Sequence, residues 1–273
     1  MHFVNKNGVP FLQFPHLNKF ENVFHAFTTR QGGGSRGPFE SLNLGFHTDD
    51  RYQQVLDNRE KTFSAFGWKI QSVVNPIQVH GNRIARVTRK DKGKGACDLK
   101  SRLSAADGLI TNEKGVLLMI NVADCFSVFL YDPSHQAVGI LHAGWRGTAQ
   151  GIIRAGIEAM TTSFGSQPKK IKAGVGPGIN KCCYQVGREV LKKFNTFKKQ
   201  KAINNFGKQS IENEDCYLDL KRIIFSQLIE NGVEKENVDI AGECTCCNPE
   251  LFFSHRRDKG RTGRMAALIG LEN

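Results

Sequence analysis

Cys125 and His142 are the two residues whose types and spacing most directly suggest chemistry. They lie in a dense stretch, residues 121–147, which reads NVADCFSVFLYDPSHQAVGILHAGWRG. A thiolate and an imidazole held side by side can share a metal ion, or they can act as a nucleophile and its base. After His142, a glycine-rich segment leads into a helical pattern that begins at Thr148. Such a junction is a typical anion site, so a metal pair and a phosphate site could adjoin.

A hairpin must bring these two residues together. Phe126–Tyr131 and Ala137–His142 are apolar runs typical of strands, and the five polar residues between them predict a turn. With a five-residue turn, Phe126 faces His142 and Cys125 lies within one register step of His142. Opposed residues in such a ladder have Cβ atoms about 4.5–5.5 Å apart, which is close enough for both side chains to reach one ion.

The rest of the chain predicts strands mixed with helices. A helix capped by Asp49 or Asp50 should end at Phe66, before Gly67, and a second helix should cover Thr148–Phe164. Ser72–Val79 should pair with Ile84–Thr88 across a Gly81-Asn82 turn, and Met265–Leu271 should form the last strand. No repeat, linker or composition break divides residues 1–273. We therefore expect one domain of the α+β class, with mixed sheets packed together and helices outside.

Composition narrows the kinds of partner. The 273 residues carry a formal net charge of +12, which suits a phosphate-bearing substrate and also permits nucleic-acid contact. No apolar run approaches the roughly 20 residues that a membrane span needs. The first residues show no secretion signal, so we expect a cytoplasmic protein with no membrane partner. The sequence leaves the oligomeric state open.

Several motifs, taken together, resemble those of the YfiH family, also called laccase-domain proteins. They span nearly the whole chain in order, and they are TTRQGGGS and SLNLG (28–45), QVHG (78–81), ADG (106–108), ADC (123–125), HAGWRG (142–147), CCYQVG (182–187), ECT (243–245) and FFSHRRDKGRTGR (252–264). The resemblance implies a fold similar to the catalytic domain of cytotoxic necrotising factor. It also implies a zinc-dependent purine nucleoside phosphorylase that deaminates adenosine as a side activity. Gln185 departs from the family, which more often has Glu there.

Carried over by motif, the zinc ligands would be His80, Cys125 and His142. Three protein ligands leave a fourth position open, which is the pattern of a catalytic zinc ion. The implied substrates are adenosine, inosine and methylthioadenosine, each cleaved by phosphate to the free base and a ribose 1-phosphate. Copper could also occupy the site adventitiously, because copper(II) competes well for nitrogen and sulfur ligands.

Other polar residues near these motifs could serve the reaction. Cys125 and Asp124 are the candidate catalytic residues. Arginine forks match phosphate oxygens, and short polar side chains could bind ribose or base. The candidate substrate and phosphate ligands are Arg30, Asn43, Gln78, Asp107, Arg146 and Arg256. For Asp107 and Asp124, an equally good interpretation is a carboxylate that orients a metal ligand.

Three alternatives remain open on the residues. A copper-dependent polyphenol oxidase of the multicopper type needs roughly ten histidine ligands, whereas this chain has eight histidines and no H-x-H pair. A thiol hydrolase or deamidase would use Cys125 as nucleophile and His142 as base. A basic nucleic-acid-binding protein would explain the charge, but the sequence carries no recognition motif for that role.

The eight cysteines form two local clusters. Cys182 and Cys183 are adjacent, and Cys244, Cys246 and Cys247 lie together near the C-terminus. This clustering favours metal binding or buried thiols over a disulfide framework. The chain lacks the paired CxxC spacing of a structural zinc site, so we assign no role to Cys183, Cys246 or Cys247.

Overall fold

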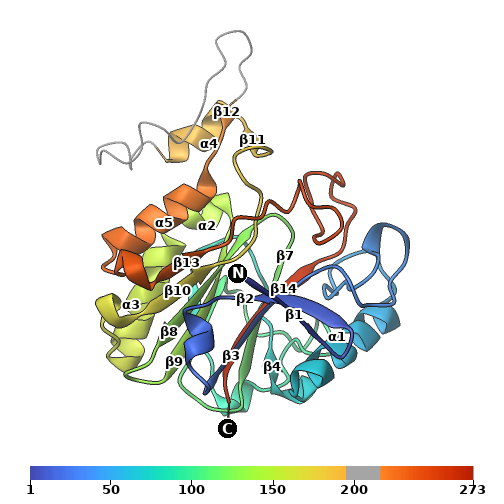
Figure 1. Ribbon diagram of the computed structural model, residues 1–273, viewed down its shortest axis with the longest axis horizontal. Coiled ribbons are helices and arrows are strands. Elements are labelled where there is room, and N and C mark those ends of the chain that lie inside the picture. Colours follow the sequence, from blue (N-terminus) through green and yellow to red (C-terminus); the bar gives the residue numbers. More distant parts are fainter. Residues whose placement is uncertain (195–215, 273) are drawn as a thin grey trace.

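Two six-stranded sheets packed face to face form the centre of the molecule (Figure 1). The computed structural model describes residues 1–194 and 216–272. The first sheet has the order β1-β2-β3-β14-β7-β4, and its strands are β1 His2–Lys6, β2 Val9–Gln13, β3 Val23–Thr28, β4 Val73–Val74, β7 Leu117–Val122 and β14 Met265–Leu271. The second has the order β13-β10-β8-β9-β6-β5, from β5 Ile84–Arg86, β6 Gly108–Thr111, β8 Phe126–Asp132, β9 Ala137–Ala143, β10 Lys172–Val175 and β13 Val238–Ile240.

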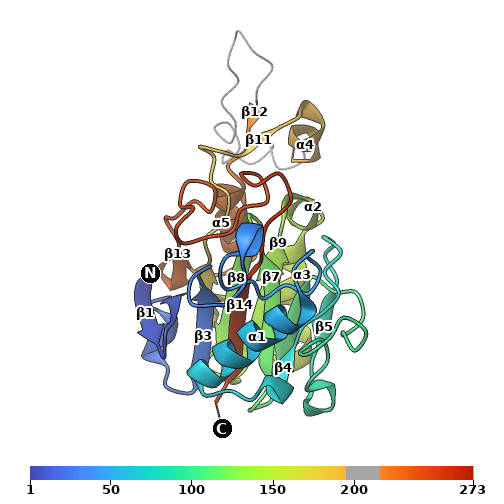
Figure 2. The same ribbon diagram turned by 90° about the vertical axis from the view of Figure 1, so that its right-hand side faces the viewer.

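Helices cover the two outer faces of this sandwich (Figures 1 and 2). They are α1 Tyr52–Phe66, α2 Trp145–Ala149, α3 Ile152–Phe164 and α5 Leu220–Glu230, whereas α4 Arg188–Lys193 lies beyond one end of the sheets. Short 3-10 turns occupy Leu17–Lys19, Gly37–Phe39, Ile70–Ser72, Arg89–Asp91, Pro168–Lys170 and Lys235–Asn237, and a small ribbon pairs β11 Gln185–Val186 with β12 Cys216–Tyr217. The expected α+β class, with mixed sheets and outer helices, is confirmed. Within the described residues, no helix is long and apolar enough to cross a membrane.

Three apolar layers hold the sandwich together. The middle layer lies between the sheets and includes Phe129 and Ile140 from the second sheet with Leu118 and Ile269 from the first. One outer layer packs α3 and α5 on the second sheet, and the other packs α1 on the first sheet. Both faces of the central strands are therefore covered, which explains why β7, β8, β9 and β14 are buried along their whole length and mostly apolar.

The β8–β9 hairpin forms as predicted, but its register is one residue different. Asp132 pairs with Ala137 and Ser127 pairs with His142, whereas we expected Phe126 opposite His142. The turn is shorter than expected because Asp132 stays in the ladder while its carboxylate accepts the main-chain N–H of Ser134. The correction matters, because a one-residue shift moves every side chain to the other face of a strand.

Three other expected elements differ from the structure. Ser72–Val79 forms only the two-residue strand β4, and β4 and β5 belong to different sheets, so they do not form the predicted hairpin. The predicted helix Thr148–Phe164 is two helices, which separate at Gly151, where φ is +82°. α1 ends at Gly67 as expected, but it begins after Arg51 without the predicted aspartate cap.

Candidate metal centre and substrate pocket

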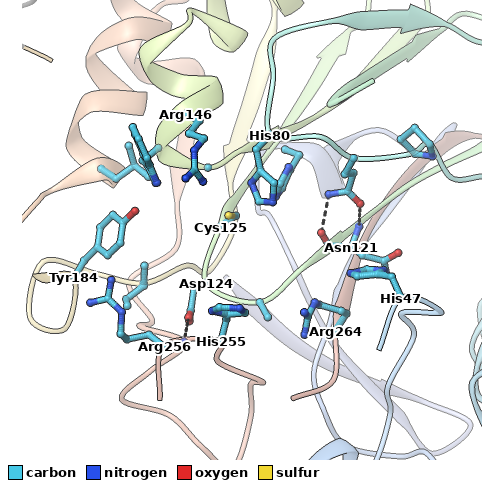
Figure 3. A pocket seen from close by; sticks show the side chains of 18 of the residues that line it. His47, His80, Asn121, Asp124, Cys125, Arg146, Tyr184, His255, Arg256 and Arg264 are labelled. Carbon is cyan, nitrogen blue, oxygen red and sulfur yellow. Dashed lines mark hydrogen bonds between the residues drawn. The ribbon is translucent and has the colours of Figure 1, made fainter. Parts of the chain in front are cut away.

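A pocket of about 530 Å³ opens at one end of the sandwich (Figure 3). It lies where β7 ends, where β8 and β9 meet the turn before α2, and where the chain enters β14. Its lining residues are His47, Pro76, Gln78, His80, Arg102, Asn121, Ala123, Asp124, Cys125, His142, Gly144, Trp145, Arg146, Ile179, Tyr184, Leu220, His255, Arg256 and Arg264. The volume suits a ligand of nucleoside size.

His80, Cys125 and His142 meet near the centre of this pocket. One ligand atom from each lies within 4.8 Å of those of the other two, although the three residues come from separate segments. The observed register explains the meeting: Ser127 faces His142, and Cys125, two residues earlier, projects on the same side of β8 as Ser127. The register that we expected from the sequence would have turned Cys125 to the opposite face.

Asp107 fixes two of these three residues. It is fully buried, and one carboxylate oxygen lies 2.9 Å from His142 Nδ1. The same carboxylate accepts the main-chain N–H groups of Val79, His80 and Gly81 at 3.2, 2.9 and 2.7 Å. These bonds hold the turn in which His80 has a φ of +60°. Asp107 therefore has no free surface for the predicted substrate contact, and it positions His80 and His142 instead.

Gly144 leaves the space in which the three ligand atoms converge. A Cβ atom at this position would lie 2.9 Å from Cys125 Sγ and 3.3 Å from His80 Nδ1. The backbone φ of Gly144 is −75°, which any residue can adopt. The glycine is therefore required for space and not for an unusual backbone conformation.

The thiol and the imidazoles shift each other's pKa. Burial alone would raise the pKa of Cys125, but the charge and hydrogen bonds of His142 and His80 lower it to about 6. Burial would lower the pKa of His142, but Cys125 and Asp107 raise it to about 9. These shifts favour a thiolate at Cys125 beside an imidazolium at His142 when no ion is bound. A softly nucleophilic sulfur and two imidazoles form a donor set that zinc favours.

Asp124 lies in the pocket wall and ties two loops to the hairpin. Its φ is +84°, and both carboxylate oxygens have partners. Oδ1 accepts the Thr245 hydroxyl at 2.6 Å, and Oδ2 accepts the main-chain N–H of Arg256 at 2.7 Å. Both oxygens therefore hold the Thr245 and Arg256 segments, and neither is bonded to the side chain of a metal ligand.

One side of the pocket is aromatic and apolar. Figure 3 shows Tyr184, Arg146 and Arg256 on this side of Cys125. Trp145 and Tyr184 contribute rings, and the Arg146 and Arg256 guanidinium groups lie 4.6 and 5.3 Å from these rings, respectively. Arg256 also donates to the carbonyl oxygens of Cys183 and Gln185. The structure thus brings the predicted residues Arg146 and Arg256 to the pocket.

The other side is polar and basic, and the sequence analysis missed most of it. His47, Asn121 and Arg264 lie on this side (Figure 3), and burial together with the charges of Arg264 and Arg102 lowers the pKa of His47 to about 3. In the described part of the chain, Nε and Nη2 of Arg102 are buried without a hydrogen-bond partner. A buried cation with unpaired N–H groups is a good site for an anion.

Gln78 reaches the pocket as predicted, but its amide is already paired. Its side chain exchanges two hydrogen bonds with the main chain of Asn121, at 2.9 and 2.8 Å. These bonds hold the segment before His80 against β7. Gln78 is thus a lining residue whose amide orients the ligand turn.

Two predicted substrate ligands besides Asp107 lie outside the pocket lining. Arg30 donates to the carbonyl oxygens of Glu40 and Pro249 and stacks on Phe253. Asn43 is fully buried, and its amide group binds Asp50 and Arg264. The structure thus places both side chains in contacts that hold loops together and not in the pocket where substrate contact was expected. The helix expected to begin at Thr148 begins at Trp145 instead, so Thr148 is buried inside α2 and the junction that was expected to bind an anion lies at Gly144, in the pocket lining.

Fold and site together define a two-sheet protein with a Cys/His donor set in its pocket, and comparison with known proteins places the chain in a family. A family model described as multi-copper polyphenol oxidoreductase laccase matches residues 24–272. The chain belongs to this laccase-domain family, which confirms the resemblance to YfiH proteins.

Curated relatives and crystal structures agree with this placement. Purine nucleoside phosphorylase YlmD of Bacillus subtilis (strain 168) is 41% identical over 254 residues, which cover 92% of this chain and 90% of the relative. YlmD of Geobacillus stearothermophilus is 38% identical and covers 92% and 91% of the two chains. The structures of Bacillus licheniformis YfiH and G. stearothermophilus YlmD superpose with TM-scores of 0.92 and 0.91, at 36% and 35% identity, and each covers 99% of both chains.

Proposed function

We propose that the protein is a purine nucleoside phosphorylase that uses a metal ion at His80, Cys125 and His142. One observation carries the proposal: a single pocket places aromatic rings on one side of this donor set and unpaired guanidinium N–H groups on the other. In such a pocket a flat purine could stack on the aromatic side, a phosphate anion could bind on the guanidinium side, and the ribose could lie between them. The names of the curated relatives at 41% and 38% identity support the same reaction.

Zinc is the proposed ion. Two imidazoles and a thiolate suit it, the Asp107 carboxylate orients His142 as zinc-bound histidines require, and three protein ligands leave a position for substrate or water. When bound, zinc would supply Lewis-acid polarisation of a ribose hydroxyl, or of a water in the adenosine deaminase side reaction. Copper could bind the same donors adventitiously.

The polar side of the pocket is the proposed phosphate site. Arg102 would donate its two unpaired N–H groups to phosphate oxygens, and Arg264 lies on the same side of the donor set. A phosphate held there faces the centre of the pocket, where the ribose C1′ would lie. Positioning of this kind can supply about 7–11 kcal/mol of a reaction barrier. This proposal places the phosphate beside Arg102, which was not among the arginines Arg30, Arg146 and Arg256 that the sequence offered as its candidate ligands.

The aromatic side is the proposed purine site. Tyr184 and Trp145 would stack on the base, and Ile179 and Leu220 would exclude water from it. Arg146 is exposed and points into the pocket, so it could stabilise the negative charge that develops on the departing purine. Adenosine, inosine and methylthioadenosine all fit this description, and we propose them as the substrates.

The test is to incubate zinc-loaded protein with inosine, with and without phosphate, and to follow hypoxanthine and ribose 1-phosphate. We expect both products only when phosphate is present, and we expect chelation to abolish their formation. An Arg102→Gln variant should need more phosphate for the same rate, whereas Arg89→Gln, which changes an exposed arginine in the same region, should not. Hypoxanthine release without phosphate would refute the phosphorylase.

A thiol hydrolase or deamidase is the second candidate, favoured by one observation. The lowered pKa of Cys125 and the raised pKa of His142 would form a nucleophile and general acid pair without any metal. Chelation separates the two candidates, because the hydrolase should keep its activity in the chelator and lose it on alkylation of Cys125. A multicopper oxidase fits less well, since the described residues offer imidazole ligands at only one clustered site.

A further inference from the structure

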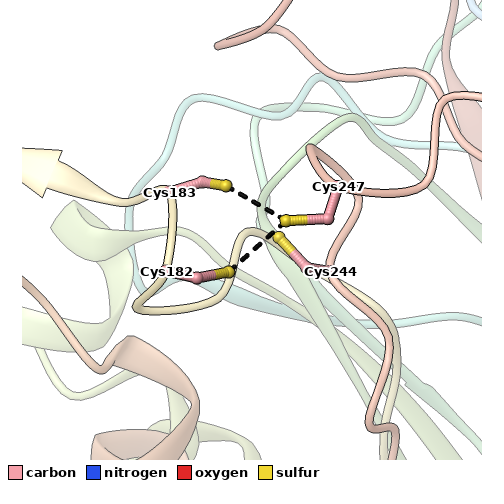
Figure 4. A group of neighbouring side chains, drawn as sticks. All are labelled: Cys182, Cys183, Cys244 and Cys247. Carbon is pink, nitrogen blue, oxygen red and sulfur yellow. Dashed lines mark hydrogen bonds between the residues drawn. The ribbon is translucent and has the colours of Figure 1, made fainter.

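Four cysteines outside the pocket converge on one point (Figure 4). The sulfur atoms of Cys182, Cys183, Cys244 and Cys247 all lie within 4.8 Å of one another. Cys247 Sγ is 3.5 Å from Cys182 Sγ and 3.2 Å from Cys183 Sγ. A tetrahedral zinc ion with Zn–S bonds of about 2.3 Å holds its sulfurs about 3.8 Å apart. The four atoms therefore need to move only slightly to enclose an ion.

The fold builds this cluster from two neighbouring loops. β10 and β13 are parallel neighbours, so the chain leaves both strands at the same edge of the second sheet. The loops then join through the main-chain N–H of Thr245, which donates to the carbonyl oxygen of Gly178 at 3.0 Å. One loop supplies the adjacent pair Cys182-Cys183, and the other supplies Cys244 and Cys247 in CxxC spacing. The sequence favoured metal binding or buried thiols at these clusters, but it gave little support to a structural zinc site because only one half of the arrangement has that spacing.

Main-chain amides already point at one of the sulfurs. The N–H of Asn180 donates to Cys244 Sγ at 3.3 Å, and the amides of Cys246 and Cys247 also donate to it. Amide donors around a sulfur stabilise negative charge on it, as a metal-bound thiolate requires. Two of the four cysteines, Cys182 and Cys247, are exposed, so an ion can enter from solvent.

Positive charge lies next to the cluster. Four thiolates around a divalent ion carry a net charge of −2. Arg256 donates to the carbonyl oxygen of Cys183 at 3.4 Å, and Arg257 donates to those of Thr245 and Cys246 at 3.0 and 3.4 Å. Arg257 is paired with Asp258 at 2.8 and 2.9 Å, so Arg256 supplies the charge that would offset the bound ion, and both arginines join the loops to the C-terminal segment.

We propose that Cys182, Cys183, Cys244 and Cys247 form a second, structural metal site that binds zinc through four thiolates. Zinc replaces the thiol protons, which are released to solvent, and no electron transfer is involved. The convergence of four sulfur atoms favours a metal over a disulfide. Cys247 Sγ lies close to both Cys182 Sγ and Cys183 Sγ, and a disulfide could join it to only one of them, whereas one ion can bind all four sulfurs. With no open position, the ion would have a structural and not a catalytic role.

The site would stabilise one wall of the substrate pocket. Tyr184 follows Cys183 directly and lines the pocket, and Thr245 lies inside the CxxC segment and donates to Asp124. An ion that joins the two loops would therefore fix Tyr184 and Asp124 relative to each other. The zinc-binding proposal itself does not depend on the proposed reaction, since the four sulfur atoms lie outside the His80, Cys125 and His142 donor set.

The test is the zinc content of purified protein and of three variants. The wild-type protein should hold two zinc ions per chain. His80→Ala/Cys125→Ala and Cys182→Ser/Cys247→Ser should each hold one, and the control Cys97→Ser should hold two. If the serine variant does not fold, X-ray absorption of the zinc in His80→Ala/Cys125→Ala decides, because it should report four sulfur neighbours and no nitrogen.

The cobalt-substituted His80→Ala/Cys125→Ala protein should also show the intense absorption bands of a tetrahedral Co²⁺ thiolate. Three results would overturn the proposal: His80→Ala/Cys125→Ala protein without zinc, zinc in that protein bound through nitrogen, or a disulfide at Cys247 in protein purified under reducing conditions. None of these results bears on phosphorolysis of inosine, so the two proposals fail separately.

Discussion

Replacement of Asp107 by asparagine tests the architecture of the metal centre most directly. The Asp107 carboxylate is fully buried and binds four groups: three main-chain N–H groups around His80 and the Nδ1 atom of His142. Asparagine keeps one accepting oxygen and places an NH₂ group against donors. Loss of a buried charge partner costs about 3–5 kcal/mol of stability. Loss of a residue that orients a zinc ligand lowers metal affinity about 10–100-fold.

Asp132→Asn is a matched control. Asp132 lies at the turn of the β8–β9 hairpin, whereas His142, which Asp107 contacts, lies near the open end of the same hairpin. Asp132 is also fully buried, and it binds His135 Nδ1 at 2.7 Å and the main-chain N–H of Ser134 at 2.9 Å, far from the pocket. Both variants should unfold at lower denaturant concentration, but only Asp107→Asn should bind zinc more weakly in competition with a chromophoric chelator. Any zinc bound at the four-cysteine cluster contributes equally to the zinc binding of both variants, so it does not affect the difference between them. Equal zinc affinity in the two variants would show that Asp107 does not organise the donor set.

Three further predictions follow from the same geometry. Gly144→Ala should lose the pocket zinc with little loss of stability, because its Cβ would lie 2.9 Å from Cys125 Sγ; metal analysis and thermal unfolding measure both. Arg102→Gln should raise the KM for phosphate about 10–100-fold, as expected for a lost charged hydrogen bond, with a smaller change in kcat. In metal-free protein, iodoacetamide should alkylate Cys125 with a midpoint near pH 6. The pKa of Cys125 is lowered from 9.0 to about 6 in the folded protein, so the stability that this thiolate contributes is lost as pH falls through that range. The pKa of His142 is raised from 6.5 to about 9, so the stability that this imidazolium contributes is lost as pH rises through that range, and urea unfolding from pH 6 to pH 9 would measure the two opposed losses.

Local sequence signals predicted the strands well and their pairing less well. Apolar runs located β7, β8, β9 and β14 because both faces of these strands are buried. The turn signal at Gly81-Asn82 predicted a hairpin, but β4 pairs with β7 and β5 pairs with β6, each in parallel. A short polar turn cannot show whether the chain reverses within one sheet or crosses to another. That choice depends on Asp107, which holds the turn from a distant segment.

The sequence indicated the residues of the donor set, whose type limits the chemistry they can do. It did not indicate the pocket residues whose role depends on how the chain packs around them. A thiol and two imidazoles are rare side chains with few uses, so motif resemblance found all three. Polar side chains such as Asn43 and Arg30 have many uses, and the structure places both in loop contacts. Arg102 carries no motif, and it lies in a polar segment that reads as exposed loop. Only the tertiary structure buries its N–H groups beside the pocket.

The net charge of +12 permitted two partner classes, a small phosphate or a nucleic acid, and the arrangement of the arginines favours the first. Arg256 and Arg264 line the pocket and bind main-chain carbonyl oxygens rather than carboxylates, so their charge is oriented without being neutralised. Arg102 adds a guanidinium with unpaired N–H groups in the same concave space. Positive charge focused inside a pocket of about 530 Å³ attracts an anion small enough to enter it. A polyanion would instead need a basic surface that follows its backbone.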